Sequence, residues 1–377
     1  MTNKRIYFDY LATTPCDHRV AEVVMKYMTE RFGNAGSVDH VFGDEADLAV
    51  KQAAQQVADL VGARPKEVIF TSGATESINL VLQGLRTQGI KRIAVLPVEH
   101  KAVLDTCNFL EKEGLAEIVY LRVDSKGRLD LEHLEAVCTE GLSLICVMAA
   151  NNEIGNIYPI EKVGSIAQKY NIPFLCDGSQ AVGKIPINCN EMGITYLAIS
   201  GHKMYAPKGI GALVVQRGNF LKPLIYGGGQ QFGMRSGTMN VSSIVGLGEA
   251  CRLRLLEMEV DEGEISLKRD RLQILLQESI PGLVVNGDID NRLAGSLHIS
   301  VPHIPNKAVI ARIRHQLAIS TGSACTSGIE SPSHVLTAIR LEDRLITGAL
   351  RIGLGKFISI DDVELAHQIL MEAILSI

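Results

Sequence analysis

Short apolar segments alternate with helical segments over residues 67–216, and this alternation constrains the fold more than any other feature of the chain. The segments rich in apolar and β-branched residues are 67–71, 92–97, 117–122, 143–148, 172–177, 194–200 and 210–216. Several, such as 143–148, are apolar at nearly every position, which is typical of strands covered by helices on both faces. Helical spacing over 74–88 and 101–113 fits between them. We therefore predict an α/β fold built on a mostly parallel sheet.

The remaining third of the chain has a different pattern. Residues 241–279 contain no proline and are rich in Leu, Glu, Arg and Met, which predicts a long connecting helix or a helix pair. The elements expected after it are a strand at 295–301, a helix at 306–317, a strand at 350–354 and an amphipathic helix at 361–375 with Ser359 as its cap. This pattern indicates a second, smaller α+β domain.

Composition excludes several functional classes. The 377 residues include 37 Lys and Arg against 42 Asp and Glu, so the net charge of −5 disfavours a protein that coats nucleic acid. The N-terminus lacks the apolar core of a signal peptide, and no apolar run approaches the roughly 20 residues that cross a bilayer. The eight cysteines form no CxxC pair and no zinc-type spacing. We expect a cytoplasmic protein with reduced thiols, no membrane span and no metal site.

A possible phosphate site lies at Thr71-Ser72-Gly73-Ala74-Thr75-Glu76, where a strand ends and a helix begins at once. Unpaired amides and the helix dipole at such a point attract anions, although an ordinary capped turn has the same sequence pattern. Two other glycine clusters do not match nucleotide-binding loops. Gly353-Leu354-Gly355-Lys356 lacks the upstream glycine of a P-loop, and Gly209-Ile210-Gly211 runs into a strand.

Two chemically useful residues follow apolar strands. Asp177 ends the strand Phe174-Leu175-Cys176, and Lys203 follows the next one in Ser200-Gly201-His202-Lys203. Ligands of open α/β sheets bind at this end of the strands, where a carboxylate can face a cationic ring nitrogen and a desolvated lysine can attack an aldehyde. Taken singly, Asp177 is also explained as a turn residue and Lys203 as a surface charge.

Together the motifs resemble those of one family. They are Asp9-Tyr10-Leu11-Ala12-Thr13-Thr14, Thr71–Glu76, Glu99-His100-Lys101, Asn151-Asn152-Glu153-Ile154-Gly155, Asp177–Gln180, Ser200–Lys203, Arg235-Ser236-Gly237-Thr238 and Gly322-Ser323-Ala324-Cys325-Thr326-Ser327. In this order they resemble the pyridoxal-phosphate-dependent cysteine desulfurases of the NifS/IscS-like branch, from about residue 6 to about residue 370.

The resemblance implies the fold type I architecture of class V aminotransferases. Its large domain, with a mostly parallel seven-stranded sheet, would span 14–256, and its smaller α+β domain would combine 1–13 with 257–377. It also implies pyridoxal 5'-phosphate (PLP) as cofactor, L-cysteine as substrate, a homodimer with the cofactor near the subunit interface, and a sulfur-acceptor protein as partner. We expect neither a membrane partner nor direct nucleic-acid binding.

The resemblance also assigns residues by position. Lys203 matches the lysine that forms a Schiff base with PLP, and Asp177 matches the carboxylate that keeps the pyridine nitrogen protonated. His100 matches the histidine stacked on the ring and a proton shuttle, and Gln180 matches the partner of the phenolic oxygen. The other implied cofactor contacts are Ala74, Thr75, Asn152, Ser200, His202 and, from the other subunit, Thr238. The implied substrate contacts are Asn152, Ala12, Thr13 and Arg351, whose guanidinium suits a carboxylate.

Cys325 distinguishes a desulfurase from its relatives. It lies in a small, polar stretch, at about 320–331, with no apolar periodicity, whereas the other seven cysteines are read as small buried apolar residues. In the family this cysteine attacks the substrate sulfur, becomes a persulfide and passes the sulfur on, and L-alanine leaves. Thr321 stands where the branch often has serine.

Three alternatives stay open from the sequence. They are a selenocysteine lyase, an aminotransferase of the same fold, which needs no persulfide cysteine, and a non-catalytic scaffold, which would be expected to lack Lys203 or Cys325. The acceptor is also open among Fe–S assembly, tRNA thiolation and DNA phosphorothioation. Since the chain stops at Ile377, soon after its last predicted helix, we expect weak binding to the Fe–S scaffold of the housekeeping enzymes.

Overall fold

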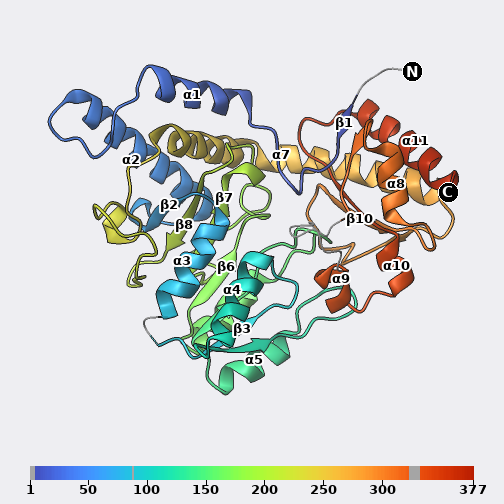
Figure 1. The fold of residues 1–377 in the computed structure, drawn as a ribbon, viewed down its shortest axis with the longest axis horizontal. Helices are drawn as coiled ribbons and strands as arrows, with labels where there is room; N and C mark the ends of the chain where they lie inside the picture. The colour runs from blue at the N-terminus through green and yellow to red at the C-terminus, as the bar shows by residue number, and fades with distance from the viewer. Residues whose placement is uncertain (1–4, 87–88, 322–331) are drawn as a thin grey trace.

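The computed structural model describes residues 5–86, 89–321 and 332–377. Its centre is a seven-stranded sheet in the order β2-β8-β7-β6-β5-β3-β4 (Figure 1). The strands are β2 (Val68–Thr71), β3 (Arg92–Val95), β4 (Glu117–Tyr120), β5 (Leu144–Cys146), β6 (Phe174–Asp177), β7 (Tyr196–Ser200) and β8 (Gly211–Val215). Only β8 runs against its neighbours, so the predicted mostly parallel sheet is confirmed.

Helices cover both faces of this sheet, which explains why its strands are apolar at consecutive positions. Helices α3 (Ala74–Arg86) and α4 (Lys101–Lys112) pack on one face, against side chains such as Ile69 and Ile93. Helices α2 (Val41–Val61), α5 (Leu131–Thr139) and α6 (Ile160–Lys169) pack on the other, against Phe70 and Ala94. Strand β4 lies at the edge of the sheet and is only partly buried.

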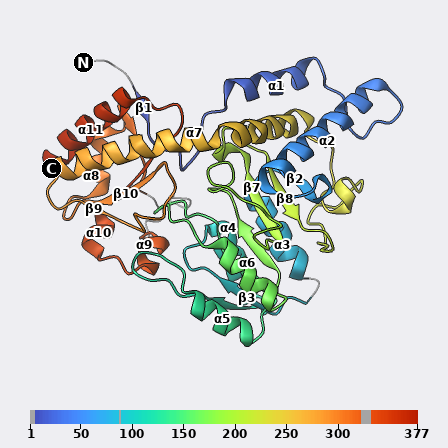
Figure 2. The ribbon, with the colours of Figure 1, turned by 180° about the vertical axis from the view of Figure 1, so that it is seen from behind.

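The proline-free segment forms one uninterrupted helix, α7 (Val241–Ser279). Its first half packs against α2 and α1 (His18–Thr29), and its second half packs against α11 (Ile360–Leu375). Figures 1 and 2 show α7 running from the side of the large sheet to the C-terminal elements. The connecting role predicted for 241–279 is therefore confirmed, as a single helix.

The C-terminal elements form a second apolar core. A three-stranded antiparallel sheet combines β9 (Val284–Val285), β10 (Ser296–Ser300) and β12 (Ala349–Gly353), and β1 (Ile6–Tyr7) pairs in parallel with β11 (Leu317–Ala318). The helices of this part of the chain are α8 (Asn306–Ile313), α9 (His334–Ala338), α10 (Asp343–Thr347) and α11. Of these, α9 packs into the core of the large sheet through Val335 and Leu336. Ser359 caps α11 by accepting a hydrogen bond from the backbone N–H of Asp362, as predicted.

One predicted element is wrong in extent. The sequence predicts a helix over 306–317, but α8 ends at Ile313. Leu317 instead pairs with Ile6, because the N-terminal residues supply a strand for it to join. A strand partner more than 300 positions away does not change the local spacing of apolar residues, so that spacing could not predict the strand at Leu317.

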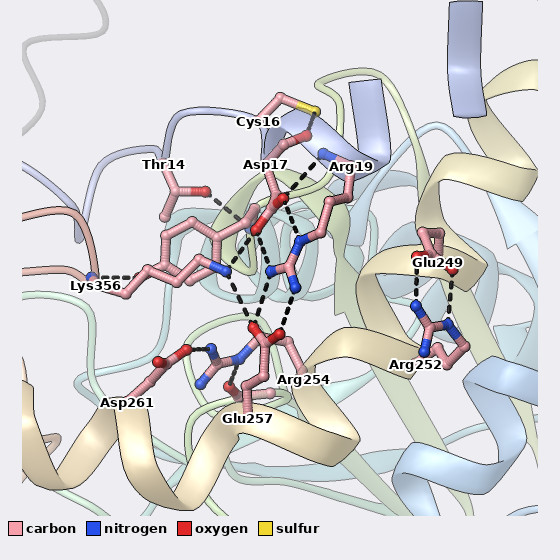
Figure 3. A network of polar contacts seen from close by, with 12 residues as sticks. Thr14, Cys16, Asp17, Arg19, Glu249, Arg252, Arg254, Glu257, Asp261 and Lys356 are labelled. Atoms are coloured by element: carbon pink, nitrogen blue, oxygen red, sulfur yellow. Dashed lines mark hydrogen bonds and ion pairs between the residues drawn. The ribbon is translucent and has the colours of Figure 1, made fainter. Parts of the chain in front are cut away.

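A polar network ties the N-terminal segment, α7 and the C-terminal elements together (Figure 3). The Lys356 ammonium donates to Asp17 Oδ2 at 2.6 Å, and Arg19 donates to Asp17 Oδ2 at 2.8 Å and to Glu257 Oε2 at 2.9 Å. Because Asp17 and Lys356 are both buried from solvent, their opposite charges compensate each other's desolvation. Within the described ranges, no helix is long and apolar enough to cross a membrane.

Candidate active site

Two adjacent parallel strands bring the predicted carboxylate and amine to one edge of the sheet. Asp177 is the last residue of β6, and Lys203 follows β7 in a short 3-10 turn, Gly201–Lys203. Strands β6 and β7 pair with Asp177 opposite Ala198. Asp177 is 5% exposed, and its Oδ1 accepts hydrogen bonds from the backbone N–H of Ser179 at 2.9 Å and from the Ser179 hydroxyl at 2.5 Å.

Lys203 lies in a setting that favours its neutral amine. Its Nζ donates to the carbonyls of Leu11 at 2.7 Å and Ala12 at 2.8 Å. Burial, followed by the positive charges of Lys184 and Arg351, lowers the pKa of Lys203 to about 7, against the opposing charges of Asp177 and Asp9. At neutral pH a large fraction of this amine therefore has the lone pair that attack on an aldehyde requires.

A cavity of about 610 Å³ joins the predicted residues. Those that line it are Ala12, Ala74, Thr75, His100, Asn152, Asp177, Gln180, Ser200, His202, Lys203 and Arg351. They come from the N-terminal segment, from the ends of five strands of the large sheet (β2, β3, β5, β6 and β7) and the loops after them, and from β12. Residues separated by up to 339 positions thus line one cavity.

One wall of the cavity has the features of a phosphate site. Helix α3 begins at Ala74, directly after β2, and Ser72, Gly73, Ala74 and Thr75 all line the cavity at its N-terminus. His202 lies nearby, and its Nδ1 is 3.0 Å from the Thr13 hydroxyl. Burial, reinforced by Lys203, lowers the pKa of His202 to about 4, so the ring is neutral at physiological pH. Helix amides and a neutral imidazole N–H are suitable donors to an anion.

Arg351 provides the one guanidinium among the cavity-lining side chains that the structure describes. It lies in β12, is 7% exposed, and donates from Nη2 to Asp9 Oδ1 at 3.0 Å and from Nη1 to the Asn152 carbonyl at 3.1 Å. Its buried Nε has no hydrogen-bond partner among the described residues. Since a buried donor without a partner is costly, this nitrogen indicates a missing acceptor, and a substrate carboxylate can supply one.

His100 is the N-cap of α4. Its Nδ1 accepts a hydrogen bond from the backbone N–H of Ala102 at 3.1 Å, which assigns the ring proton of neutral His100 to Nε2. Burial in the cavity lowers the pKa of His100, so the neutral ring predominates at pH 7. A neutral imidazole can both stack on an aromatic ring and exchange a proton.

Two predicted site residues that the structure describes, Thr13 and Thr238, do not line this cavity. Thr13 lies outside the lining, where its hydroxyl contacts His202 Nδ1 and its carbonyl accepts a hydrogen bond from the Tyr7 hydroxyl, and Thr238 is exposed in the loop before α7. Cys325 lies outside the described residues. Conversely, Asp9 accepts a hydrogen bond from Arg351, and Lys184 donates one to Gln180. No role was assigned to Asp9 or to Lys184 from the sequence. Asp9 belonged to a recognised motif, whereas no sequence signal marked Lys184.

The residues present fit PLP. The cavity offers an amine with a lowered pKa for the aldehyde, a buried carboxylate at the end of the adjacent strand for the pyridine nitrogen, and a helix N-terminus for the phosphate. Lys203, Asp177 and the residues from Gly73 to Thr75 would hold these three parts.

Comparisons with known proteins agree with this geometry. The family pattern described as Aminotransferase class-V matches residues 6–365. A cysteine desulfurase IscS from Rickettsia prowazekii (strain Madrid E) is 44% identical over 366 residues, covering 96% of this chain and 89% of the relative. A solved structure of a NifS-like protein superposes with a TM-score of 0.92 at 34% identity, covering 99% of this chain and all of the other. A structure of SspA in complex with cysteine superposes with a TM-score of 0.82 at 34% identity, over 94% of this chain and 99% of the other.

The chain therefore belongs to the class V aminotransferase family of PLP-dependent enzymes. Within that family it is a cysteine desulfurase, which takes L-cysteine as substrate and requires an acceptor for the sulfur.

Proposed function

We propose that Lys203, Asp177, Arg351, His100 and Cys325 carry out the desulfurase reaction in the roles that the family resemblance implies. The observation that supports this most is the enclosure of Lys203, Asp177 and Arg351 in one cavity, from three separate parts of the chain. PLP, when bound, supplies an aldehyde for amines and a ring that accepts the electrons left when the substrate Cα–H bond breaks. The remaining chemistry belongs to side chains of this protein.

Arg351 orients the substrate. A carboxylate that enters the cavity can accept hydrogen bonds from the unpartnered Nε and from Nη2, in a two-point contact that fixes its direction. To free Nη2, the substrate carboxylate takes the place of Asp9 Oδ1, now 3.0 Å away. Asn152, whose carbonyl holds Nη1, keeps the guanidinium in place during this exchange.

Lys203 and His100 move the protons. The neutral amine of Lys203 takes the proton from the substrate Cα, a step favoured by a pKa near the working pH. His100, with its Nε2 free of the α4 cap, exchanges a proton with the substrate thiol. The carbonyls of Leu11 and Ala12 keep the Lys203 amine at the cavity wall when it is not engaged.

Cys325 accepts the sulfur. Its thiolate attacks the substrate Sγ, so that an S–S bond forms while the Cβ–Sγ bond breaks. The electron pair of the broken bond stays on the carbon skeleton, which is protonated and leaves as L-alanine. The described residues on either side of 322–331 support this role, because Ser320 exchanges backbone hydrogen bonds with Arg351 and Pro332 lines the cavity. Cys325 is five positions after Ser320 in the sequence. Five residues of fully extended chain span at most about 18 Å.

A sulfur-labelling experiment tests this assignment. The holoenzyme is incubated with L-cysteine labelled with ³⁵S in the absence of an acceptor, and its peptides are mapped by mass spectrometry without reductant. We expect one labelled sulfur atom per subunit on the peptide that carries Cys325, with an equal amount of L-alanine. Label on another cysteine, or alanine formed without any protein-bound label, would show that Cys325 is not the acceptor.

The enzyme is also proposed to work as a homodimer in which Thr238 contacts the cofactor of the other subunit. Seven large apolar side chains on α1, α2 and the segment between them are exposed: Met25, Met28, Phe32, Val38, Val41, Phe42 and Leu48. Figure 1 shows this part of the chain extending beyond the large sheet, away from the C-terminal elements. An apolar surface of this kind is typical of a subunit interface. The proposed domain boundaries, 14–256 against 1–13 with 257–377, are supported by the second apolar core, whose buried residues other than Tyr205 all come from 1–13 or 257–377. The core around the large sheet also includes residues of the C-terminal part, such as Leu293 and Val335.

Substituting Phe42→Glu is expected to weaken the dimer about 100-fold, because each two-fold interface would bury two unpaired carboxylates. Sedimentation velocity at several concentrations measures the dissociation constant, and PLP affinity is expected to fall as Thr238 is withdrawn. Leu375→Glu, at a 59% exposed position near the end of α11, is the matched control. Equal dimer dissociation constants for both variants would remove this surface from the interface.

A further inference from the structure

The turn after β6 connects two partly buried lysines, Lys184 and Lys203, through one glutamine. Gln180 is 3% exposed, its Oε1 accepts a hydrogen bond from the Lys184 ammonium at 3.0 Å, and its Nε2 donates to the Leu11 carbonyl at 2.8 Å. The same Leu11 carbonyl accepts from the Lys203 Nζ at 2.7 Å. Lys184 is therefore linked to the Lys203 amine through two groups, the Gln180 amide and the Leu11 carbonyl.

Helix α7 holds this turn in position. Arg254, which is 1% exposed, donates from Nε to the Gly183 carbonyl at 2.7 Å and pairs with Glu262 at 3.1 Å. It also pairs with Asp261, as Figure 3 shows. Gly183 has a φ of 75°, and a Cβ there would lie 3.0 Å from Arg254 Cγ. The backbone next to Lys184 is thus fixed against a buried guanidinium.

Nearby charges of both signs act on the pKa values of Lys184 and Lys203. Burial lowers the pKa of Lys184, and the charge of Arg254 adds to this effect while that of Glu262 opposes it. After burial, Lys184 is the largest contribution to the lowered pKa of Lys203, ahead of Arg351, and Asp177 and Asp9 act in the opposite direction. The Lys184 charge is therefore felt at Lys203 although the two side chains do not touch.

The hydrogen bond from Lys184 decides which end of the Gln180 amide is available. A glutamine can present either its oxygen or its NH₂, and the two ends have opposite hydrogen-bonding character. An ammonium bound to Oε1 prevents the flip, so that only Nε2 faces Leu11 and the cavity. Nε2 carries two protons, of which the Leu11 carbonyl uses one. The second is available to an acceptor oxygen of a bound ligand.

We propose that Lys184 is a positioning residue of the cofactor site: in its ammonium form it fixes the Gln180 amide so that Nε2 points to the phenolic oxygen of PLP, and it adds a positive charge near Lys203. The proposal rests on the cofactor roles proposed above for Gln180 and Lys203. Its simplest competitor is a purely structural lysine that only compensates the buried charge of Glu262.

The test is a pH titration of the visible absorbance of the bound cofactor in the Lys184→Met holoenzyme. Methionine keeps the length and the apolar stem but removes the charge and the donors. We expect the midpoint of the titration to rise by about one pH unit, because a nearby positive charge and a donor to the phenolate both disfavour protonation of the Lys203 linkage. The matched control is Lys268→Met on α7, whose lysine pairs only with Glu264 among the described residues and is expected to leave the midpoint unchanged.

A double-mutant cycle with Gln180→Met separates positioning from structure. If Lys184 acts through the amide, Lys184→Met is expected to shift the midpoint less in the Gln180→Met background than in the wild type. Equal shifts in both backgrounds would overturn the positioning role. So would a lowered melting temperature with an unmoved midpoint, which is the result expected of a purely structural lysine.

Two further outcomes keep the result unambiguous. If Lys184→Met does not fold, Lys184→Gln, which keeps a shorter donor without charge, is titrated instead and is also expected to raise the midpoint; an unmoved midpoint there overturns the proposal. If the wild type binds PLP and desulfurates cysteine, but the Lys184 variants have the same titration midpoint as the wild type, only the role proposed for Lys184 is refuted. Cofactor absorbance that persists unchanged in Lys203→Ala would instead refute the proposed function beneath it.

Discussion

Lys203→Ala is expected to abolish cysteine desulfuration, with turnover reduced by roughly 10³-fold or more, because one side chain provides both the covalent attachment and the general base. The variant is also expected to lose the visible absorbance of the lysine-bound cofactor, while PLP can still bind through its phosphate and ring contacts. Alanine release from L-cysteine and the absorbance spectrum measure the two effects independently.

The pH dependence of cofactor attachment gives a second measurement on the same residue. Burial lowers the pKa of Lys203 from 10.5 to about 7, and only the neutral amine reacts with an aldehyde. Adding PLP to the apoenzyme should therefore show an attachment rate that rises as the pH increases through about 7 and is level well before pH 10. A rate still rising toward pH 10 would show that Lys203 is solvated like a surface lysine.

Lys268→Ala is the control for these experiments, since that lysine lies on α7, 20% exposed and paired with Glu264, away from the cavity lining. It is expected to retain wild-type turnover and spectrum. Full desulfurase activity in Lys203→Ala, with the control also active, would contradict the assignment of the cofactor lysine.

Cys325→Ala is expected to lower sulfur transfer to roughly one-thousandth of the wild-type rate or less, because no other thiol replaces the nucleophile. The cofactor site does not depend on this side chain in the proposal, so the variant should keep the absorbance of bound PLP and its change on addition of L-cysteine. Measured together, alanine formation and the absorbance separate the loss of the acceptor thiol from the loss of the cofactor.

Cys16→Ala is the matched control, because Cys16 is the one exposed cysteine among the described residues. The other six described cysteines are buried, and burial raises the pKa of each of those thiols, which makes them poor nucleophiles at neutral pH. We expect Cys16→Ala to be fully active. Loss of sulfur transfer in Cys16→Ala, with activity kept in Cys325→Ala, would reverse the assignment.

Much of the fold follows from local patterns. The residues predicted for the long helix, 241–279, are those of α7, because the absence of proline and the propensity of its residues act over the whole segment. The strands of the large sheet were also predicted in place, each one or two residues too long at one or both ends. Those ends are set by ladder hydrogen bonds to neighbouring strands. Local apolar runs carry no information about such bonds.

The candidate site also combines residues that local patterns predicted with contacts that only the fold creates. Asp177 and Lys203 were identified because each follows an apolar strand at the ligand-binding end of the sheet, a placement that chain direction alone determines. Their motifs, taken in order with the others, indicated the family and its cofactor. The contact between Asp9 and Arg351, 342 positions apart, depends on how the N-terminal segment crosses β12.

The sequence by itself therefore determined the class of fold and the cofactor, and it predicted most of the residues that line the cavity, since these depend on short motifs and their order. Only the tertiary structure decided that Lys184 binds Gln180, that Arg254 of α7 fixes the turn between them, and that Lys203 has its lowered pKa. Desolvation and the hydrogen bonds of buried groups depend on which distant segments surround a side chain, and that packing is absent from the sequence pattern.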